Sequence, residues 1–550
     1  MRSWVCFLGV LLSSAAASAQ TIPPSAEPGR VEKRFDSPPR PASRPDVLVP
    51  GPDRELAPER AAKVKIQVGA INLEGSSVYT GTDLEELYAP YIGQEVSLAD
   101  IYKLRDDLTA KYRADGYVLS QVIVPAQRIK DGQVTLQAVE GYISEILFEG
   151  AFAEATDRLS AITAPITQAR PLRIEVLERA VLLIDDIPGV TARTVLRPGT
   201  EPGAATLIVI TERKEFDASL SVDNRGTEAI GPYQINASLA MNGTLSDKGR
   251  TALRFIAIPD VKELLFGDVS HEEPIGDQGA KVSVGVRYNR SEPGGSIEAF
   301  EIDSRSLTFS AQASLPLIRS RSETFRIDLG LNVVDTESLS FGATLSEDSI
   351  RKVNGGFFWD IADSWGGSNI LQGSVVKGLT VLGSSERGDD GLTRSNGRPD
   401  FFRVTWYLQR VQPLIEGFTL VLSHEGQWAP HGLLSSEEYG IGGSAVGRGF
   451  DSSEITGDKG GAFIGELQYE LPTFELADYA QLYVSADWGK VWSYEDGTAS
   501  TRLASAAAGL RFGLFEHVTL DLQVAKPLLR APSETGDQGA RFFFALGVSY

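Results

Sequence analysis

The chain has 550 residues, too many for one ordinary hydrophobic core, so several domains are expected. Its 52 Lys and Arg against 73 Asp and Glu give a formal net charge of -21, which argues against a nucleic-acid-binding surface. The mean hydropathy is -0.09. Beyond the N-terminus no apolar run reaches the roughly 20 residues of a membrane-spanning helix. A membrane protein of this composition would have to cross with strands that have one polar face.

The N-terminus has the pattern of a secretory signal peptide at residues 1–19. Arg2 supplies positive charge, residues 5–12 are apolar, and Ala17-Ser-Ala19 is a cleavage site of small residues. The only cysteine, Cys6, lies in this segment, so the mature chain is expected to have neither a disulfide nor a thiol site. Residues 20–62 are rich in proline and predict an extended linker. Within it, residues 29–36 are the one candidate for a short helix.

Residues 63–141 have the mixed pattern of a small α+β domain. In chain order the pattern predicts a strand at 64–68, a helix after a capping box of Thr82 and Glu85, a helix from Ser97 to Gly116, and strands at 117–124 and 133–140. Residues 142–213 repeat this order, with strands near 143–148, 190–196 and 205–211 and helices near 156–162 and 172–184. Two consecutive copies of one unit indicate an array of modules.

From residue 214 to residue 550 the apolar residues recur with a period of two. The clearest segments are 282–288, 325–333, 402–409, 518–524 and the C-terminal 541–550. In the last of these, one face carries Phe542, Phe544, Leu546, Val548 and Tyr550. A soluble sandwich would also alternate, but the length of this region and the aromatic residues at the strand ends favour a membrane barrel.

The most specific motifs lie in the first module. They are Tyr112-Arg-Ala-Asp-Gly116-Tyr117, Val124-Pro125-Ala-Gln127, Asp131-Gly132 and Val139-Glu140-Gly141. In this order and spacing they resemble the first POTRA domain of two-partner secretion transporters, the outer-membrane proteins that export haemolysins and filamentous haemagglutinins. The second module resembles the family's second POTRA domain through Leu177-Glu-Arg-Ala180 and Pro188-Gly-Val190. On physical grounds alone, the glycines of these motifs would simply serve turns.

A second group of motifs lies in the strand region. Val446-Gly447-Arg448-Gly449-Phe450 is similar to the family's long inward-folding loop, whose usual core is Val-Arg-Gly-Tyr. Phe450 stands for the tyrosine, so a hydroxyl is missing. The resemblance implies that Arg448 meets Asp487, which the alternation of strand 481–488 places on the lumen side. Glu466, Gln468 and Glu470 are also predicted to face the lumen, with no specific role.

The resemblance implies an all-β transmembrane barrel of about 16 antiparallel strands over residues 214–550, preceded by two α+β POTRA domains at 63–141 and 142–213. It implies an outer-membrane location in a Gram-negative bacterium, with the POTRA domains in the periplasm. The expected partners are a secreted exoprotein with an N-terminal secretion domain, such as an adhesin, haemolysin or haem-binding protein, together with outer-membrane lipid and the barrel-assembly machinery. Export would proceed through the lumen without nucleotide hydrolysis, and a helix in the pore is a further expectation.

Two alternatives in transport remain, a barrel-assembly insertase of the same superfamily and a passive porin or receptor. An enzyme is disfavoured, because the 4 histidines, His271, His424, His431 and His517, do not lie at metal-ligand spacing. Neither a G-x-S-x-G motif nor a Walker-type loop occurs in the sequence. No catalytic residue, metal or cofactor is therefore predicted.

Overall fold

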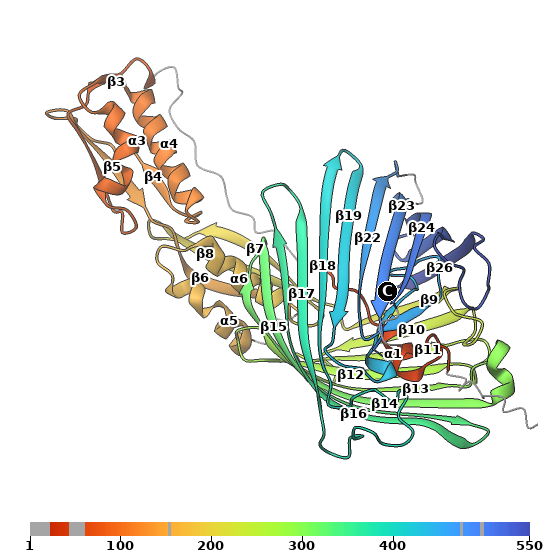
Figure 1. The fold of residues 1–550 in the computed structure, drawn as a ribbon. Helices are drawn as coiled ribbons and strands as arrows, with labels where there is room; N and C mark the ends of the chain where they lie inside the picture. Colours follow the sequence, from red (N-terminus) through yellow and green to blue (C-terminus); the bar gives the residue numbers. More distant parts are fainter. Residues whose placement is uncertain (1–21, 43–60, 152–155, 474–476, 495–499) are drawn as a thin grey trace, which may run out of the picture.

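The computed structural model describes residues 22–42, 61–151, 156–473, 477–494 and 500–550. Two small α+β modules extend from one mouth of a large barrel (Figure 1). The predicted signal peptide at residues 1–19 and the middle of the predicted linker lie outside the described residues. In the part of the chain that the structure describes, no helix is both long and apolar enough to cross a bilayer.

The first module contains two small sheets and one long helix. Its elements are β1 (Lys65–Gln67), β2 (Ala70–Glu74), η1 (Gly81–Leu84), α3 (Glu85–Tyr88), η2 (Ala89–Tyr91), β3 (Glu95–Ser97), α4 (Leu98–Ala114), β4 (Gln121–Ile123) and β5 (Gln133–Val139). The main sheet has the order β2-β5-β4, and β1 pairs with β3. α4 begins where Ser97 was expected to cap it, with the Ser97 hydroxyl accepting the Asp100 N–H.

Three details of this module differ from the prediction. The strand expected at 64–68 is β1, but a second strand that was not expected, β2, follows it after the alternation shifts phase at Gly69; β1 pairs with β3 and β2 with β5. The capping box lies at Thr80 and Asp83 rather than at Thr82 and Glu85. The strand expected at 117–124 is shorter, because Ser120 N–H bonds to Tyr117 O in a turn before β4 begins.

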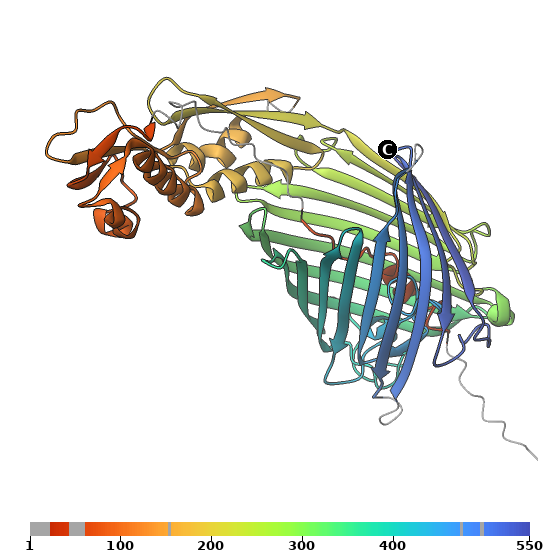
Figure 2. The same cartoon turned by 90° about the horizontal axis from the view of Figure 1, so that it is seen from above.

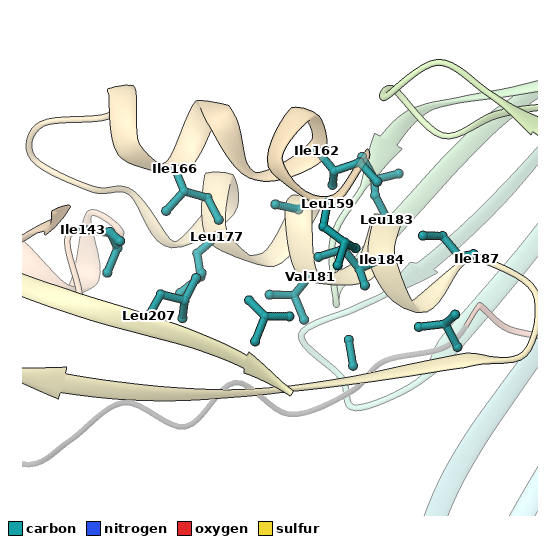
Figure 3. Close-up of a cluster of buried hydrophobic side chains, with 14 of the residues drawn as sticks. Ile143, Leu159, Ile162, Ile166, Leu177, Val181, Leu183, Ile184, Ile187 and Leu207 are labelled. Carbon is teal, nitrogen blue, oxygen red and sulfur yellow. The ribbon is translucent and has the colours of Figure 1, made fainter. Parts of the chain in front are cut away.

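The second module is a three-stranded sheet covered by two helices. It contains β6 (Tyr142–Gly150), α5 (Thr156–Gln168), α6 (Ile174–Asp185), β7 (Val190–Pro198) and β8 (Ala204–Arg213), with the sheet order β6-β8-β7. Leu159, Leu177, Ile184 and Leu207 are fully buried between the helices and the sheet (Figure 3). β6 and β7 are edge strands within the described residues.

In the described part of the chain, sixteen antiparallel strands close into a barrel, in which the last strand pairs with the first. These strands are β9 (Phe216–Asp223), β10 (Gln234–Asn242), β11 (Arg250–Ala257), β12 (Leu265–Ile275), β13 (Ala280–Ser291), β14 (Ile302–Arg319), β15 (Glu323–Ser340), β16 (Ala343–Ala362), β17 (Ser368–Leu379), β18 (Phe402–Ile415), β19 (Phe418–Trp428), β22 (Lys459–Glu470), β23 (Ala477–Trp492), β24 (Ser500–Leu514), β25 (Val518–Pro527) and β26 (Arg541–Ser549). A short helix, η3 (Gly295–Phe300), precedes β14.

The last strand has the two faces that its alternation predicts. Phe542 and Val548 are 57% and 50% exposed, whereas Phe543, between Phe542 and Phe544, is 5% exposed and points into the barrel. Tyr550 stacks on Phe216 of the first strand, with ring centroids 5.3 Å apart. The exposed apolar row therefore faces lipid, and an aromatic pair lies where the first and last strands meet the modules.

The second module is fastened to the rim of the barrel. Asp186, at the end of α6, accepts two bonds from the guanidinium of Arg319 at the end of β14, at 2.9 and 2.8 Å. Arg319 is 4% exposed. Arg179 of α6 donates to the Pro316 carbonyl at 3.3 Å. A buried bidentate pair fixes orientation as well as distance, so this module is held in one pose on the barrel.

We predict that Leu177→Ala destabilises the second module by about 2–5 kcal/mol, because it removes a fully buried side chain from the core of this module. The measurement is urea-dependent proteolysis of the full-length protein in detergent. The modules should be cleaved at lower urea while the barrel keeps its heat-modifiable mobility in electrophoresis. The control is Leu147→Ala, since Leu147 of the same module is 39% exposed; equal sensitivity of the two variants would contradict the prediction.

Candidate functional site

A long connection between β19 and β22 folds into the barrel. It contains η4 (Ser435–Glu437) and a small hairpin of β20 (Tyr439–Ile441) and β21 (Ile455–Gly457), with Arg448 at its tip. The loop packs on the wall through a buried cluster that comprises Ile441, Val446, Phe450, Ile455, Ala462, Val491 and Leu503. A loop that buries its own apolar side chains against the wall has a fixed position in the lumen.

The guanidinium of Arg448 has a different carboxylate partner from the one predicted. Its Nη1 lies 2.5 Å from Glu466 Oε2 on β22 and 2.8 Å from Ser485 Oγ on β23. Glu466 also pairs with Arg511 of β24 at 2.7 Å. The expected charge pair of Arg448 with Asp487 is therefore replaced by one with Glu466. Glu466 had been predicted only to face the lumen, and its register position opposite Ser485 brings it within reach of Arg448.

Asp487 does contact the loop, but through the backbone. Its Oδ2 accepts the N–H of Arg448 at 3.4 Å, and its Oδ1 accepts the hydroxyl of Ser505 at 2.6 Å. Ser505 in turn accepts the Gly449 N–H at 3.2 Å. The structure thus brings Arg448 and Asp487 together, with the carboxylate of Asp487 bonded to the main chain of the tip.

The residues around Arg448 suit a tight approach to the wall. Gly447 has φ +73°, a conformation that favours glycine. A Cβ on Gly449 would lie 2.8 Å from Pro527 N on β25. Phe450 is 2% exposed and packs in the apolar cluster, where a phenol hydroxyl would have to be desolvated. Phenylalanine is therefore compatible with this position.

A short helix, α1 (Pro28–Arg34), lies in the lumen beside the loop (Figures 1 and 2). This is the segment where the sequence offered its one candidate for a helix, at 29–36. Arg30 pairs with Glu438 at 2.5 Å, and Lys33 lies 3.7 Å from Glu437. One side of the helix therefore binds the loop at the last residue of η4 and at the residue that follows it. On its other side Glu32 accepts the hydroxyls of Ser306 and Thr308 of β14 at 2.5 and 3.0 Å.

The chain continues from α1 along the inner wall toward the modules. Arg254 donates to the Phe35 carbonyl at 2.5 Å, and the Ala42 N–H donates to Asp360 at 2.9 Å. Residues 37–42 line one side of a polar cavity of about 640 Å³, whose other walls include Lys281, Arg326 and Asp328, with Asp186 of the second module at its edge. A cavity lined by charged side chains therefore lies between residues 37–42, the second module and the inner wall.

The predicted motif residues of the first module bond to one another and to other residues of the same module. The Tyr112 hydroxyl lies 3.0 Å from Glu140 Oε1 and 2.7 Å from Ser76 Oγ, and its ring contacts those of Tyr79 and Tyr117. Gln127, two residues after Pro125, bonds to both the N–H and the carbonyl of Thr135 at 2.8 and 2.7 Å. The motif therefore orders the ends of α4 and β5.

The glycines of the same motif occupy positions that exclude a side chain. Gly116 and Gly132 have φ +90° and +73°. A Cβ on Gly141 would lie 2.3 Å from the Leu119 carbonyl oxygen. Each of these three positions thus requires glycine for a turn or a close backbone approach, as the purely physical interpretation expected.

Together, a closed barrel with an inward loop and two α+β modules at one mouth define an outer-membrane transporter of the POTRA-containing class. The family model described as haemolysin secretion/activation protein ShlB/FhaC/HecB matches residues 205–512. A second model, the ShlB-type POTRA domain, matches residues 66–141. The first match covers more than half of the chain, and the chain belongs to this family. It lies in the outer membrane with its POTRA domains in the periplasm.

Several curated transporters are similar over most of the chain. The heme/hemopexin transporter protein HuxB of Haemophilus influenzae (strain 86-028NP) is 25% identical over 476 residues, which cover 84% of this chain and 83% of HuxB. The outer membrane transporter CdiB of Dickeya dadantii is 22% identical over 480 residues, 84% and 83% of the two chains. The hemolysin transporter protein HpmB of Proteus mirabilis is 23% identical over 507 residues, 84% and 82% of the two chains.

Solved structures share the fold. CdiB from Escherichia coli superposes with a TM-score of 0.70 at 19% identity, over 92% of this chain and 94% of CdiB. BamA from Haemophilus ducreyi lacking POTRA domains 1-3 gives a TM-score of 0.52 at 13% identity, over 88% of this chain and 100% of that one. Among the residues that the structure describes, no group of three or more His, Cys, Asp or Glu could hold a metal ion.

We predict that Gly29→Leu drives α1 out of the lumen, because a Cβ at Gly29 would lie 2.5 Å from Ser436 Cβ in η4. The expected result is a severalfold higher conductance of the purified protein in planar lipid bilayers. The matched control is Gly267→Leu, since a Cβ at Gly267 meets no atom within 4 Å. A Gly29 variant with wild-type conductance would show that the helix tolerates the side chain in place.

We predict that Tyr112→Phe costs POTRA 1 about 1–3 kcal/mol at neutral pH, because it leaves Glu140 and Ser76 without the hydroxyl. Burial raises the pKa of Tyr112 to about 12, above the value of about 10 for the unfolded chain. Its stabilising contribution is therefore complete below about pH 10 and is lost as the pH rises toward 12.

Calorimetry of the detergent-solubilised protein between about pH 9 and pH 12 measures this dependence. The wild-type POTRA transition should fall with pH more steeply than that of Tyr112→Phe, while Tyr102→Phe on the same helix should follow the wild type. Parallel curves for all three proteins would rule out the role of the Tyr112 hydroxyl.

Proposed function

We propose that this protein exports an unfolded exoprotein across the outer membrane in two-partner secretion. The proposal is supported by membership of the haemolysin secretion/activation family and by the names of the relatives, which are transporters of heme/hemopexin and hemolysin systems and the outer membrane transporter CdiB. The client would be a secreted protein with an N-terminal secretion domain, such as an adhesin, a haemolysin or a haem-binding exoprotein. Outer-membrane lipid and the barrel-assembly machinery are its other expected partners.

The POTRA domains are the proposed docking site. β7 of POTRA 2 is a nine-residue edge strand on which Val195 is 41% exposed, and β4 of POTRA 1 is a shorter edge. An extended segment of the client can add to such an edge through main-chain hydrogen bonds. Client folding outside the cell would then bias movement through the lumen without nucleotide hydrolysis, and the protein itself would not act as an enzyme.

The single observation that favours export over a passive pore is the content of the lumen. Both α1 and the loop that carries Arg448 lie inside the barrel, and neither is part of its wall. A segment held by ion pairs to another segment can be released when a client arrives, whereas a passive pore has no need for it. The insertase alternative shares the barrel fold, and the likeness to BamA supports the fold alone.

The test of this function is deletion of residues 63–140, followed by comparison of the proteins in the culture medium with those of cells that carry the wild type. An exporter should lose the secreted partner while the barrel still reaches the outer membrane. Unchanged secretion, or a general loss of other outer-membrane proteins, would favour a porin or an insertase respectively.

We predict that Arg448→Ala leaves the barrel inserted but reduces export of the partner severalfold, because the loop tip loses its bond to Glu466. Glu466→Gln should have a similar effect, and Asp487→Asn a smaller one, since Asp487 contacts the tip through the backbone N–H. The control is Arg398→Ala, whose guanidinium bonds at 2.6 Å to Asp400, two residues further along the chain. Wild-type amounts of exported partner from the Arg448 variant would refute this role.

A further inference from the structure

The junction of the first and last strands is short compared with its neighbours. β26 and β9 share five register pairs, from Ser549 with Ser219 to Ala545 with Asp223, whereas β9 and β10 share eight. The periplasmic end of this seam is well bonded, with Tyr550 N–H donating to the Ala218 carbonyl at 2.9 Å. At the other end, residues 541–544 of β26 extend past the last ladder pair.

A side chain extends the ladder beside its last backbone bond, in which the Asn224 N–H donates to the Phe544 carbonyl at 3.3 Å. The Asn224 amide accepts the Phe544 N–H at 2.7 Å and donates to the Phe542 carbonyl at 3.0 Å. An amide group has the same donor and acceptor as a peptide group, so one asparagine replaces one missing pair. These bonds lie beyond Asp223, the last residue of β9.

Two arginines from opposite sides of the seam enclose one ring in the lumen. Arg225 follows the first strand, and its guanidinium carbon lies 3.9 Å from the centroid of the Phe543 ring. Arg541 begins the last strand, and its guanidinium carbon lies 5.1 Å from the same centroid. Phe543 is 5% exposed. Cation–π contacts at these distances hold both arginines against the inner wall.

The same two arginines hold consecutive carbonyl groups of the loop tip. Arg225 Nη1 donates to the Arg448 carbonyl at 3.3 Å, and Arg541 Nη1 donates to the Gly449 carbonyl at 3.2 Å. Arg541 Nη2 also bonds to Asp451, which is 6% exposed, at 2.7 Å. The tip therefore contacts both sides of the seam at the level where the ladder has ended.

We propose that the tip of the inward loop, residues 448–451, is a staple that holds the first and last barrel strands together from inside. Asn224, Arg225 and Arg541 are the residues that position it. The Arg448 side chain anchors the staple to β22 and β23. The main-chain carbonyl of Arg448 accepts a bond from Arg225, which follows β9. Withdrawal of the loop leaves the backbone bonds between residues 218–224 and 544–550, together with the Asn224 side-chain amide, to close the barrel.

The helix in the lumen acts on the same point. Arg34 of α1 donates to the carbonyl of Arg225 and, at 3.3 Å, to Gln234 Oε1. Arg225 therefore binds the Arg448 carbonyl through its side chain and binds Arg34 of the helix through its own main-chain carbonyl. The contents of the lumen and the closure of the barrel are linked through residue 225.

The experiment compares hydrogen exchange of the wild type with the double variant Arg225→Gln/Arg541→Gln, both purified in detergent. Exchange of the amides in peptides that cover 216–224 and 541–550 should become about tenfold faster or more, because charge-assisted bonds across the seam are lost. Exchange in β15 and β16 should stay unchanged. The control is Arg326→Gln, a lumenal arginine of β15 bonded to Asp328, which should leave the seam as slow as in the wild type.

Two results overturn the proposal. One is a seam that exchanges at the wild-type rate in the double variant. The other is acceleration spread evenly around the barrel, which indicates general destabilisation.

A second variant tests the cause directly. Asp223→Cys and Ala545→Cys, the register pair of β9 and β26 that lies at the same end of the seam as the loop tip, can be joined by a disulfide in the background of the double variant. Since Cys6 is the only cysteine in the sequence, the bond is unambiguous. The disulfide should restore slow exchange at the seam, and rapid exchange despite the disulfide overturns the proposal. Because export is not measured, the outcome is independent of the proposed function.

Discussion

The structure depends on one constraint, which is that every backbone N–H and C=O inside a bilayer must be bonded within the protein. A sheet can meet this only by closing on itself, so β26 has to pair with β9. Closure then fixes which side chains face lipid, because successive residues alternate between the two faces. The apolar row on β26 and the polar interior are both consequences of closure.

Buried charges in the polar interior fix the positions of other charged side chains. Glu466 lies between Arg448 and Arg511, and its side chain is only 5% exposed. A buried carboxylate without a cation would be costly, so each such group specifies the position of its partner. In this barrel some of the partners belong to the wall, as Arg511 of β24 does, and others to segments that are separate from it, namely the loop and α1. Ion pairs thus fix the positions of the loop and of α1 inside the barrel.

Much of the fold could be predicted from the sequence, because period-two alternation and capping patterns are local signals. The two faces of 541–550 and the start of α4 at Ser97 follow from neighbouring residues alone. The partner of Arg448 could not be found in this way. It depends on the register of β22 against β23, which places Glu466 opposite Ser485. Similarly, β2 lies beyond the phase shift at Gly69 and outside the expected strand at 64–68, and nothing in the alternation of 64–68 reveals it.

The position of α1 has a consequence for the biogenesis of the barrel. The helix precedes every strand of the barrel in the chain, whereas the strand that closes the barrel, β26, is synthesised after the other fifteen strands of the described barrel. The N-terminal segment must therefore either enter the nascent sheet while it is still an open trough or thread through the finished mouth afterwards. In the first case the barrel closes around α1, and it is never present in the membrane as a pore without this helix.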